Sequence, residues 1–241
     1  MKKLWVCDFD GTLYKNNDKR SFSKALDYLY SLRKSGGEFI VASGRPLHLL
    51  KPFFNRFEDT YFISCDGALF SKGFEILKGF PIDKKEINKI TEKTKLQYVL
   101  VGACISYVHC RDISLKMKLC KFYNGHTVSV ESPFETDGEI YKTAFFGEYK
   151  NFDGLEECWN SYGIHEYVTN GVNKGACLEY ALDFLGFSKA NTFAAGDGQN
   201  DVSMFDKAFK SYAMESAPPP VKRVADCVVS DINYAFNEGQ G

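Results

Sequence analysis

Short apolar runs alternate with amphipathic segments through the first third of the chain. The first run lies near the N-terminus, and similar β-type runs cover Glu38–Ala42 and Tyr61–Ser64. The segments between them carry apolar residues at helical spacing. This β-α-β-α-β order is typical of a parallel sheet, in which each strand is followed by a crossover helix.

The two helices expected between these strands have different signals. The first is expected to begin at Ser21 or Ser23 as the N-cap and to stop at Gly36-Gly37. The second is expected to run from Pro46 to about Phe57. Both are short enough to connect neighbouring strands of one sheet.

The pattern changes from about residue 80, where strands cluster with short helices. We expect helices over 83–95, 115–122 and 155–162, and strands over 99–110 (broken at Gly102-Ala103), 127–130 and 141–146. The parallel sheet is expected to resume near Val168, followed by a helix from Asn173 to Gly186 and a strand over Thr192–Ala195. The predicted fold is therefore α/β: a doubly wound, mostly parallel sheet core over 1–78 and 168–241, with an inserted α+β cap over 79–167.

Composition excludes several classes of function. The 241 residues carry 30 Lys and Arg against 31 Asp and Glu, so no basic surface for nucleic acid or anionic lipid is expected. The longest uncharged stretch, Leu96–Val108, is shorter than the ~18 residues of a membrane span. Met1-Lys2-Lys3 leads directly into a strand, so we expect no signal peptide, and the eight cysteines form no C-x-x-C pair. We expect a cytoplasmic protein with reduced thiols, and nothing in the sequence indicates its oligomeric state.

Acidic and small residues follow three of the predicted strands. Asp8 and Asp10 end the first run, Ser43-Gly44-Arg45 follows the second, and Gly196-Asp197-Gly198-Gln199-Asn200-Asp201 follows the strand at 192–195. A lone D-x-D before glycine is most often a solvated turn. Three strands that deliver such residues to one edge of a sheet instead indicate a ligand crevice, where a cation or ligand compensates the carboxylates. Lys174 in the first turn of a helix also indicates a nearby anion, because the helix dipole disfavours a cation there.

In these four motifs and their order the chain resembles the haloacid dehalogenase-like phosphatases, and within them the Cof-type branch with its late-inserted α/β cap. The motifs are Asp8-Phe9-Asp10-Gly11-Thr12, Ser43-Gly44-Arg45, Lys174 and Gly196–Asp201. The resemblance covers the two core segments. The cap matches only in position and in its pattern of elements.

The resemblance implies a magnesium-dependent phosphatase that acts on a small phosphomonoester, such as a sugar phosphate. Asp8 would be the nucleophile that forms an aspartyl-phosphate, and Asp10 the general acid and base. Asp8, the Asp10 carbonyl and Asp197 would hold Mg²⁺, and Asp201 would support that shell from outside.

The resemblance also implies a phosphate-binding set. Ser43, the Gly44 amide and Lys174 would contact phosphate. Asn200 would bond phosphate or Asp8, although it could equally cap a helix. Thr12 would orient Asp8 or satisfy a turn. The expected partner is a small phosphorylated metabolite.

Departures from the family pattern concern specificity. Asp66-Gly67-Ala68 stands where the family commonly has Asn-Gly-Ala, so Asp66 is a candidate specificity residue. Glu215 begins a loop whose family pattern is Gly-Asn-Ala. Arg45 could contact substrate or form a structural ion pair.

Other functions stay open at this point. A sugar phosphomutase would pass the phosphoryl group between positions of one sugar instead of to water. A D-x-D glycosyltransferase also holds a metal, but its motif normally follows a nucleotide-binding region. A phosphate-binding module without catalysis would be expected to lack Asp8 or Asp10, and both are present.

Overall fold

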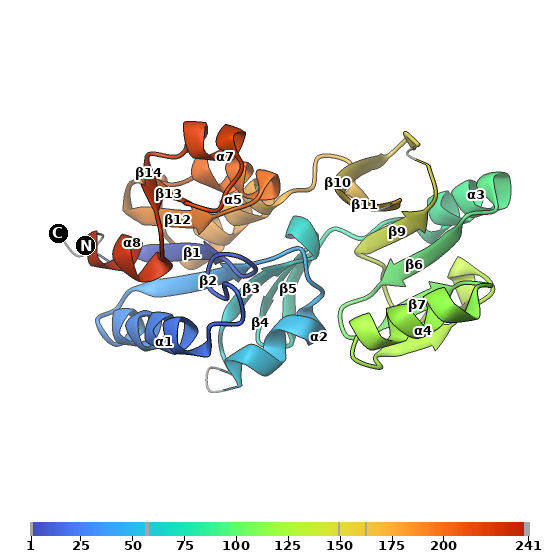
Figure 1. Cartoon of the computed structure of the whole chain (residues 1–241), viewed down its shortest axis with the longest axis horizontal. Coiled ribbons are helices and arrows are strands. Elements are labelled where there is room, and N and C mark those ends of the chain that lie inside the picture. Colours follow the sequence, from blue (N-terminus) through green and yellow to red (C-terminus); the bar gives the residue numbers. More distant parts are fainter. Residues whose placement is uncertain (1, 56–57, 149, 162, 239–241) are drawn as a thin grey trace. The chain divides into compact units, whose positions relative to one another are not determined.

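The computed structural model describes residues 2–55, 58–148, 150–161 and 163–238 (Figure 1). The chain divides into two compact units by its internal contacts. The first unit comprises Met1–Ser43, Asp59–Ile63 and Asn173–Gly241, and the second comprises Gly44–Glu58 and Ser64–Val172. The core and cap boundaries expected from the sequence remain a prediction, and each unit is described by itself below.

The first unit is built on a parallel sheet in the order β14-β13-β12-β1-β2-β3. Its strands are β1 (Leu4–Asp8), β2 (Glu38–Ala42), β3 (Tyr61–Ser64), β12 (Thr192–Gly196), β13 (Lys210–Met214) and β14 (Cys227–Val229). Every residue of β1 is buried, as expected for a parallel strand covered on both faces. The order reverses beside β1, because β2 and β3 extend to one side and β12 to β14 to the other. This is a doubly wound sheet, so the predicted fold class is confirmed.

Helices cover both faces of this sheet. They are α1 (Lys19–Lys34), α5 (Lys174–Leu185), α6 (Val202–Phe205), α7 (Pro219–Val224) and α8 (Ile232–Glu238), with 3₁₀ turns at Lys189–Asn191 and Gln199–Asp201. Figure 1 shows α1 and α8 on one face and α5 and α7 on the other. The expected cap of α1 is wrong: Asp18 accepts from the amides of Arg20 and Ser21, because it directly precedes the first helical residue. The expected limits of α5 are confirmed, with Asn173 as N-cap and Gly186 in the left-handed conformation after its last turn.

An aromatic cluster fixes β1 in the middle of the sheet. The Trp5 ring stacks on Phe193 of β12 at 5.1 Å and on Tyr212 of β13 at 5.5 Å. Phe236 of α8 meets the same ring edge-on at 4.8 Å. Because Trp5 is fully buried, these contacts hold the strand that carries Asp8 against its neighbours.

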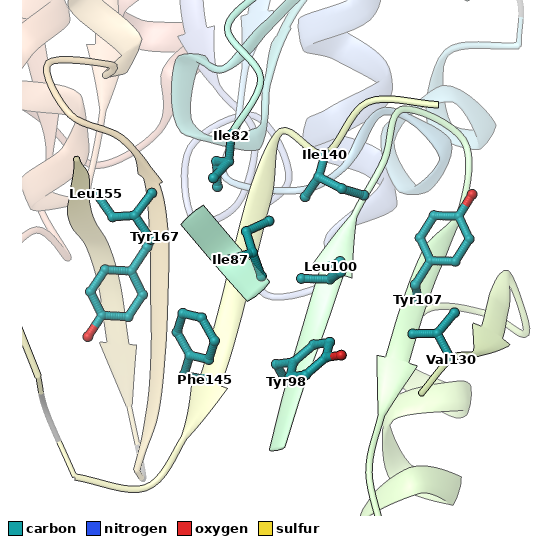
Figure 2. Close-up of a cluster of buried hydrophobic side chains, with 10 residues drawn as sticks. All are labelled: Ile82, Ile87, Tyr98, Leu100, Tyr107, Val130, Ile140, Phe145, Leu155 and Tyr167. Atoms are coloured by element: carbon teal, nitrogen blue, oxygen red, sulfur yellow. The ribbon is translucent and has the colours of Figure 1, made fainter. Parts of the chain in front are cut away.

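The second unit contains a sheet in the order β10-β11-β9-β6-β7-β8, antiparallel except between β7 and β8. Its strands are β6 (Gln97–Val101), β7 (Ser106–His109), β8 (Thr127–Ser129), β9 (Lys142–Phe146), β10 (Leu155–Ser161) and β11 (Ile164–Thr169). The antiparallel pair β4 (Leu69–Lys72) and β5 (Glu75–Gly79), which also lies in this unit, belongs to the other sheet of the chain. The helices are α2 (Leu47–Leu50), α3 (Lys84–Thr94) and α4 (Ile113–Phe122), with 3₁₀ turns at Lys51–Phe54, Cys65–Gly67 and Pro133–Glu135. Figure 2 shows the buried core of this unit, where Tyr98 and Leu100 of β6 gather with Phe145 of β9 and Ile87 of α3.

Two expectations for the strands of this unit need correction. Residues 155–161 form strand β10 and not a helix, and Tyr162 lies outside the described residues. A bulge between Glu157 and Trp159 interrupts the alternation of inward and outward side chains along the strand. The apolar residues therefore have a spacing that resembles that of a helix. Val168 lies in β11, antiparallel to β9 and β10, so the parallel sheet resumes only at β12.

The helix expected from Pro46 to Phe57 is also shorter than predicted. It comprises α2 and one 3₁₀ turn that ends at Phe54. Pro52 lies in that turn and has no amide to donate, which disfavours a continuous α-helix. Residues 56 and 57 lie outside the described part of the chain.

Candidate active site

Asp8 is the last residue of β1, at the point where the strand order reverses. In an open α/β sheet the connections leave toward opposite faces at this point, and a ligand crevice forms at the carboxyl ends of the strands. Asp8 lies opposite Ala42 of β2. The chain then turns tightly, with the Leu13 amide donating to the Asp8 carbonyl at 3.2 Å. Asp10, within this turn, is exposed.

Lys174 joins two of the predicted acidic residues. It is the first residue of α5, and its Nζ donates to Asp8 Oδ1 at 2.8 Å and to Asp201 Oδ1 at 2.6 Å. Lys174 is 1% exposed, Asp8 5% and Asp201 0%. The sequence indicated an anion near Lys174, and these two carboxylates are anions that it contacts.

Asp201 anchors the loop that follows β12. Its Oδ2 accepts from the backbone amides of Asp197 at 2.9 Å and Gly198 at 2.8 Å, while Oδ1 bonds Lys174. A Cβ on Gly196 would lie 2.5 Å from the Asp201 side chain, so only glycine leaves room for this approach. Asp201 thus fixes the backbone that carries Asp197.

The turn after β1 packs directly against Asp197. Gly11 has φ +83°, and a Cβ there would lie 2.2 Å from Asp197 Oδ2. The Thr12 hydroxyl donates to Asp197 Oδ1 at 3.4 Å. It therefore supports Asp197 and not Asp8, although orienting Asp8 was one of the two roles expected for it. Gly11 and Thr12 therefore bring the Asp8 and Asp197 segments together.

The charges of this cluster are unbalanced. Carboxylate oxygens of Asp8, Asp197 and Asp201 lie within 4.8 Å of one another, and the ammonium group of Lys174 contacts two of the three, Asp8 and Asp201. Burial raises the pKa of Asp8 well above its ordinary value; Asp201 adds to the rise and Lys174 opposes it. Burial, again with Asp201, raises the pKa of Asp197 to about 6.

One oxygen of the cluster lacks a hydrogen-bond partner. Asp8 Oδ2 is buried and has none among the residues that the structure describes. A buried carboxylate oxygen without a donor is costly unless a cation or ligand occupies the space beside it. The cluster could therefore hold a metal ion, and its all-oxygen donor set suits a hard cation.

The remaining predicted residues of the first unit lie after β2 and after β12. Ser43 directly follows β2, is buried, and donates its amide to the Ile63 carbonyl at 2.8 Å. Asn200 lies in the 3₁₀ turn beside Asp201. A Cβ on Gly198 would lie 2.5 Å from Asn200 Oδ1, so the amide side chain folds over its own loop.

Gly44, Arg45 and Asp66 belong to the second unit. The Arg45 guanidinium lies over the Phe53 ring, 5.7 Å from its centroid. Asp66 is buried and forms an ion pair with Lys142. Sequence reasoning missed Lys142, whose one signal is a charge at the edge of an otherwise apolar run that ends at Phe146.

Comparison with known proteins identifies the family. A family model described as haloacid dehalogenase-like hydrolase matches residues 5–235. The chain belongs to this family. The match spans both units, so the family predicted from the four motifs is confirmed.

Similar proteins support the same class of enzyme. The chain is 25% identical to the putative phosphatase YkrA of Bacillus subtilis, over 98% of this chain and 97% of that protein. It is also 25% identical to the pyridoxal phosphate phosphatase YbhA of Escherichia coli, over 95% and 93% of the two chains. A hypothetical protein from Geobacillus kaustophilus has the same fold, with a TM-score of 0.85 at 22% identity over 100% and 99% of the two chains. Together with the family match, the relatives confirm the predicted class, a phosphoric monoester hydrolase.

The described residues contain no helix that combines the length and apolar character needed to cross a bilayer.

Proposed function

We propose that this hydrolase is a magnesium-dependent phosphatase that releases inorganic phosphate from a small phosphomonoester through an aspartyl-phosphate on Asp8. One observation carries the proposal: a buried carboxylate at the switch point of the sheet bonds a lysine through one oxygen, and its other oxygen has no donor among the described residues. Such an oxygen is suited to a cation or to an electrophile.

The first half of the reaction forms a covalent intermediate. An Asp8 carboxylate oxygen attacks phosphorus, and the bond between phosphorus and the leaving oxygen breaks. Asp10, exposed in the turn after β1, donates a proton to that oxygen. In the second half Asp10 accepts a proton from water as the water attacks phosphorus, and the Asp8–phosphorus bond breaks. Splitting the hydrolysis into two steps lowers the barrier of a reaction that is very slow in water.

Asp8, the Asp10 carbonyl and Asp197 are the residues that would hold Mg²⁺, with Asp201 supporting them from behind. When bound, the ion neutralises the excess carboxylate charge and polarises the phosphoryl group. The two backbone amides that Asp201 accepts hold the Asp197 loop in place. The elevated pKa of Asp197 fits a ligand whose compensating charge comes from a cation.

Lys174, Ser43, the Gly44 amide and Asn200 are proposed to bind the phosphoryl oxygens. Lys174 carries the nearest positive charge to Asp8, so it would reduce the repulsion between the nucleophile and an anionic substrate. Residues 79–167 are proposed as the cap that selects the substrate. The relative YbhA is named for pyridoxal phosphate, which is consistent with a small phosphorylated metabolite as the substrate class.

The test is substitution of the nucleophile. Asp8→Asn should abolish phosphate release from a panel of phosphomonoesters with Mg²⁺, because an amide is a poor nucleophile here. Asp183→Asn, which changes an exposed carboxylate of α5, serves as the matched control and should retain full activity. More than a few per cent residual turnover in folded Asp8→Asn contradicts the covalent route. Isomerised sugar phosphate in place of free phosphate would indicate a mutase.

A further inference from the structure

A second buried lysine lies in the second unit, far in sequence from the four motifs. Lys142, at the start of β9, is 4% exposed. Its Nζ donates to the Gly44 carbonyl at 2.9 Å and to Asp66 Oδ2 at 2.9 Å, and it forms an ion pair with Glu166 of β11. An ammonium group has three donors, and these three acceptors account for all of them.

The charge state of Lys142 follows from these neighbours. Burial alone would lower its pKa, but Asp66 and Glu166 together raise the pKa well above its ordinary value. Lys142 is therefore an ammonium ion held by two carboxylates and one carbonyl. Because the pair is buried, removal of the lysine would leave uncompensated negative charge.

The backbone at Gly44 is held from two further directions. Asp66 packs against its α-carbon, where a Cβ would lie 2.9 Å from Asp66 Oδ2. The next carbonyl, of Arg45, accepts from the Cys65 amide at 3.0 Å. Together with Lys142, these contacts restrain the α-carbon of Gly44 and the two peptide groups that follow it, Gly44–Arg45 and Arg45–Pro46.

The turn that carries Asp66 needs such restraint. Cys65 and Asp66 both have positive φ, 52° and 55°, which residues other than glycine rarely adopt. A strained conformation persists only where the surroundings hold it. The ion pair to Lys142 is an interaction of this kind, because it fixes the Asp66 carboxylate in the buried position that meets Gly44.

We propose that Lys142 is a positioning residue for phosphate binding, which holds the peptide group after Gly44, and through the Gly44 α-carbon the direction of the Gly44 amide, in one conformation. The proposal rests on the proposed function, because it takes the Gly44 amide as a phosphate donor. Lys142 itself contacts no reacting atom in this scheme. Asp66 then anchors this lysine. The sequence suggested that Asp66 adds a negative charge near the substrate, but in this scheme Lys142 neutralises that charge.

The test compares Lys142→Met with Lys84→Met. Lys84 also donates to a backbone carbonyl of the second unit, that of Thr136 at 2.7 Å, and it is the matched control. The Kd of inorganic phosphate is measured calorimetrically with Mg²⁺, and kcat and KM are measured on the best phosphomonoester. Loss of a charged hydrogen bond to the loop should raise both the phosphate Kd and KM about tenfold or more, with little change in kcat. Lys84→Met should match the wild type.

A double variant separates positioning from charge balance. Lys142→Met with Asp66→Asn removes one unpaired buried carboxylate, so stability should recover partly while the phosphate Kd stays high. Recovery of wild-type phosphate affinity in the double variant would overturn the proposal, as would unchanged Kd and KM in folded Lys142→Met. If the wild type neither hydrolyses phosphomonoesters nor binds phosphate, the proposed function itself fails and this inference fails with it.

Discussion

The acidic cluster predicts an unusual dependence of stability on pH when no cation is bound. The pKa of Asp197 is raised from 3.8 to about 6, so the folded protein tolerates the protonated carboxyl better than the carboxylate. The contribution of protonated Asp197 to the free energy of unfolding is therefore complete below about pH 4 and is lost as the pH rises through about 6. Asp8, whose pKa is also raised, acts in the same direction.

The size of the effect follows from the shift. About two pKa units at 1.36 kcal/mol each give a ceiling of about 3 kcal/mol. Because Asp197 is partly exposed, solvent screening reduces this to about 1–2 kcal/mol. In chelator, the free energy of unfolding of Asp197→Asn should rise relative to the wild type by that amount between pH 4 and 6, and then stay level.

The assay is urea unfolding of both proteins across this pH range, with chelator and then with Mg²⁺. The ion should stabilise the wild type at pH 7 and should stabilise Asp197→Asn much less, since binding to the folded state adds to its stability. Parallel pH profiles for the two proteins in chelator would refute the account of Asp197. Equal stabilisation of both by Mg²⁺ would refute its role as a ligand.

Two further substitutions test the packing of the cluster. Lys174→Met should remove activity and lower the free energy of unfolding by about 3–5 kcal/mol, because it leaves buried carboxylates without their cation. The control is Lys207→Met, which breaks the exposed pair of Lys207 with Glu179 and should change the free energy of unfolding by less than about 1 kcal/mol. Gly11→Ala should weaken Mg²⁺ binding measured by calorimetry, since its Cβ would lie 2.2 Å from Asp197. Gly125→Ala is the control: Gly125 also has a positive φ, but its Cβ would meet nothing within 4 Å, so this variant should bind Mg²⁺ normally. Normal Mg²⁺ affinity in Gly11→Ala would show that the turn does not set the position of Asp197.

The parallel sheet and its acidic edge could be predicted because their signals are local. Each predicted strand of the first unit contains a continuous apolar run, and small or acidic residues follow it. Parallel strands bring those ends to one edge whatever the lengths of the connections. The limits of the helix that Lys174 begins were predictable for the same reason, because Asn173 and Gly186 mark its two ends.

Other features depend on pairing between distant segments and carry weak local signals. The β10 strand lost its alternation to a bulge, and the β4–β5 hairpin contains a register shift between Phe70 and Ser71. Neither irregularity is determined by its own residues alone, since a bulge exists only relative to a partner strand. The contact of Lys142 with Asp66 joins residues 76 positions apart, and no spacing rule connects them.

The two buried lysines show why acidic residues alone do not identify the catalytic cluster. Lys174 bridges Asp8 and Asp201, and Lys142 bridges Asp66 and Glu166, so each ammonium group is paired with two carboxylates. By the proximity of the ligand atoms, Asp8, Asp197 and Asp201 could be taken for a metal site, and so could Asp66 and Glu166 with the Cys158 thiol. Around Lys142, the third donor is used by a backbone carbonyl, and the ammonium group lies where a cation would have to bind. Around Lys174, a third carboxylate remains uncompensated, and Asp8 Oδ2 has no donor in the part of the chain that the structure describes. The unmet demand for positive charge, and not the number of acids, therefore distinguishes a site that binds a cation and substrate from one that holds a loop.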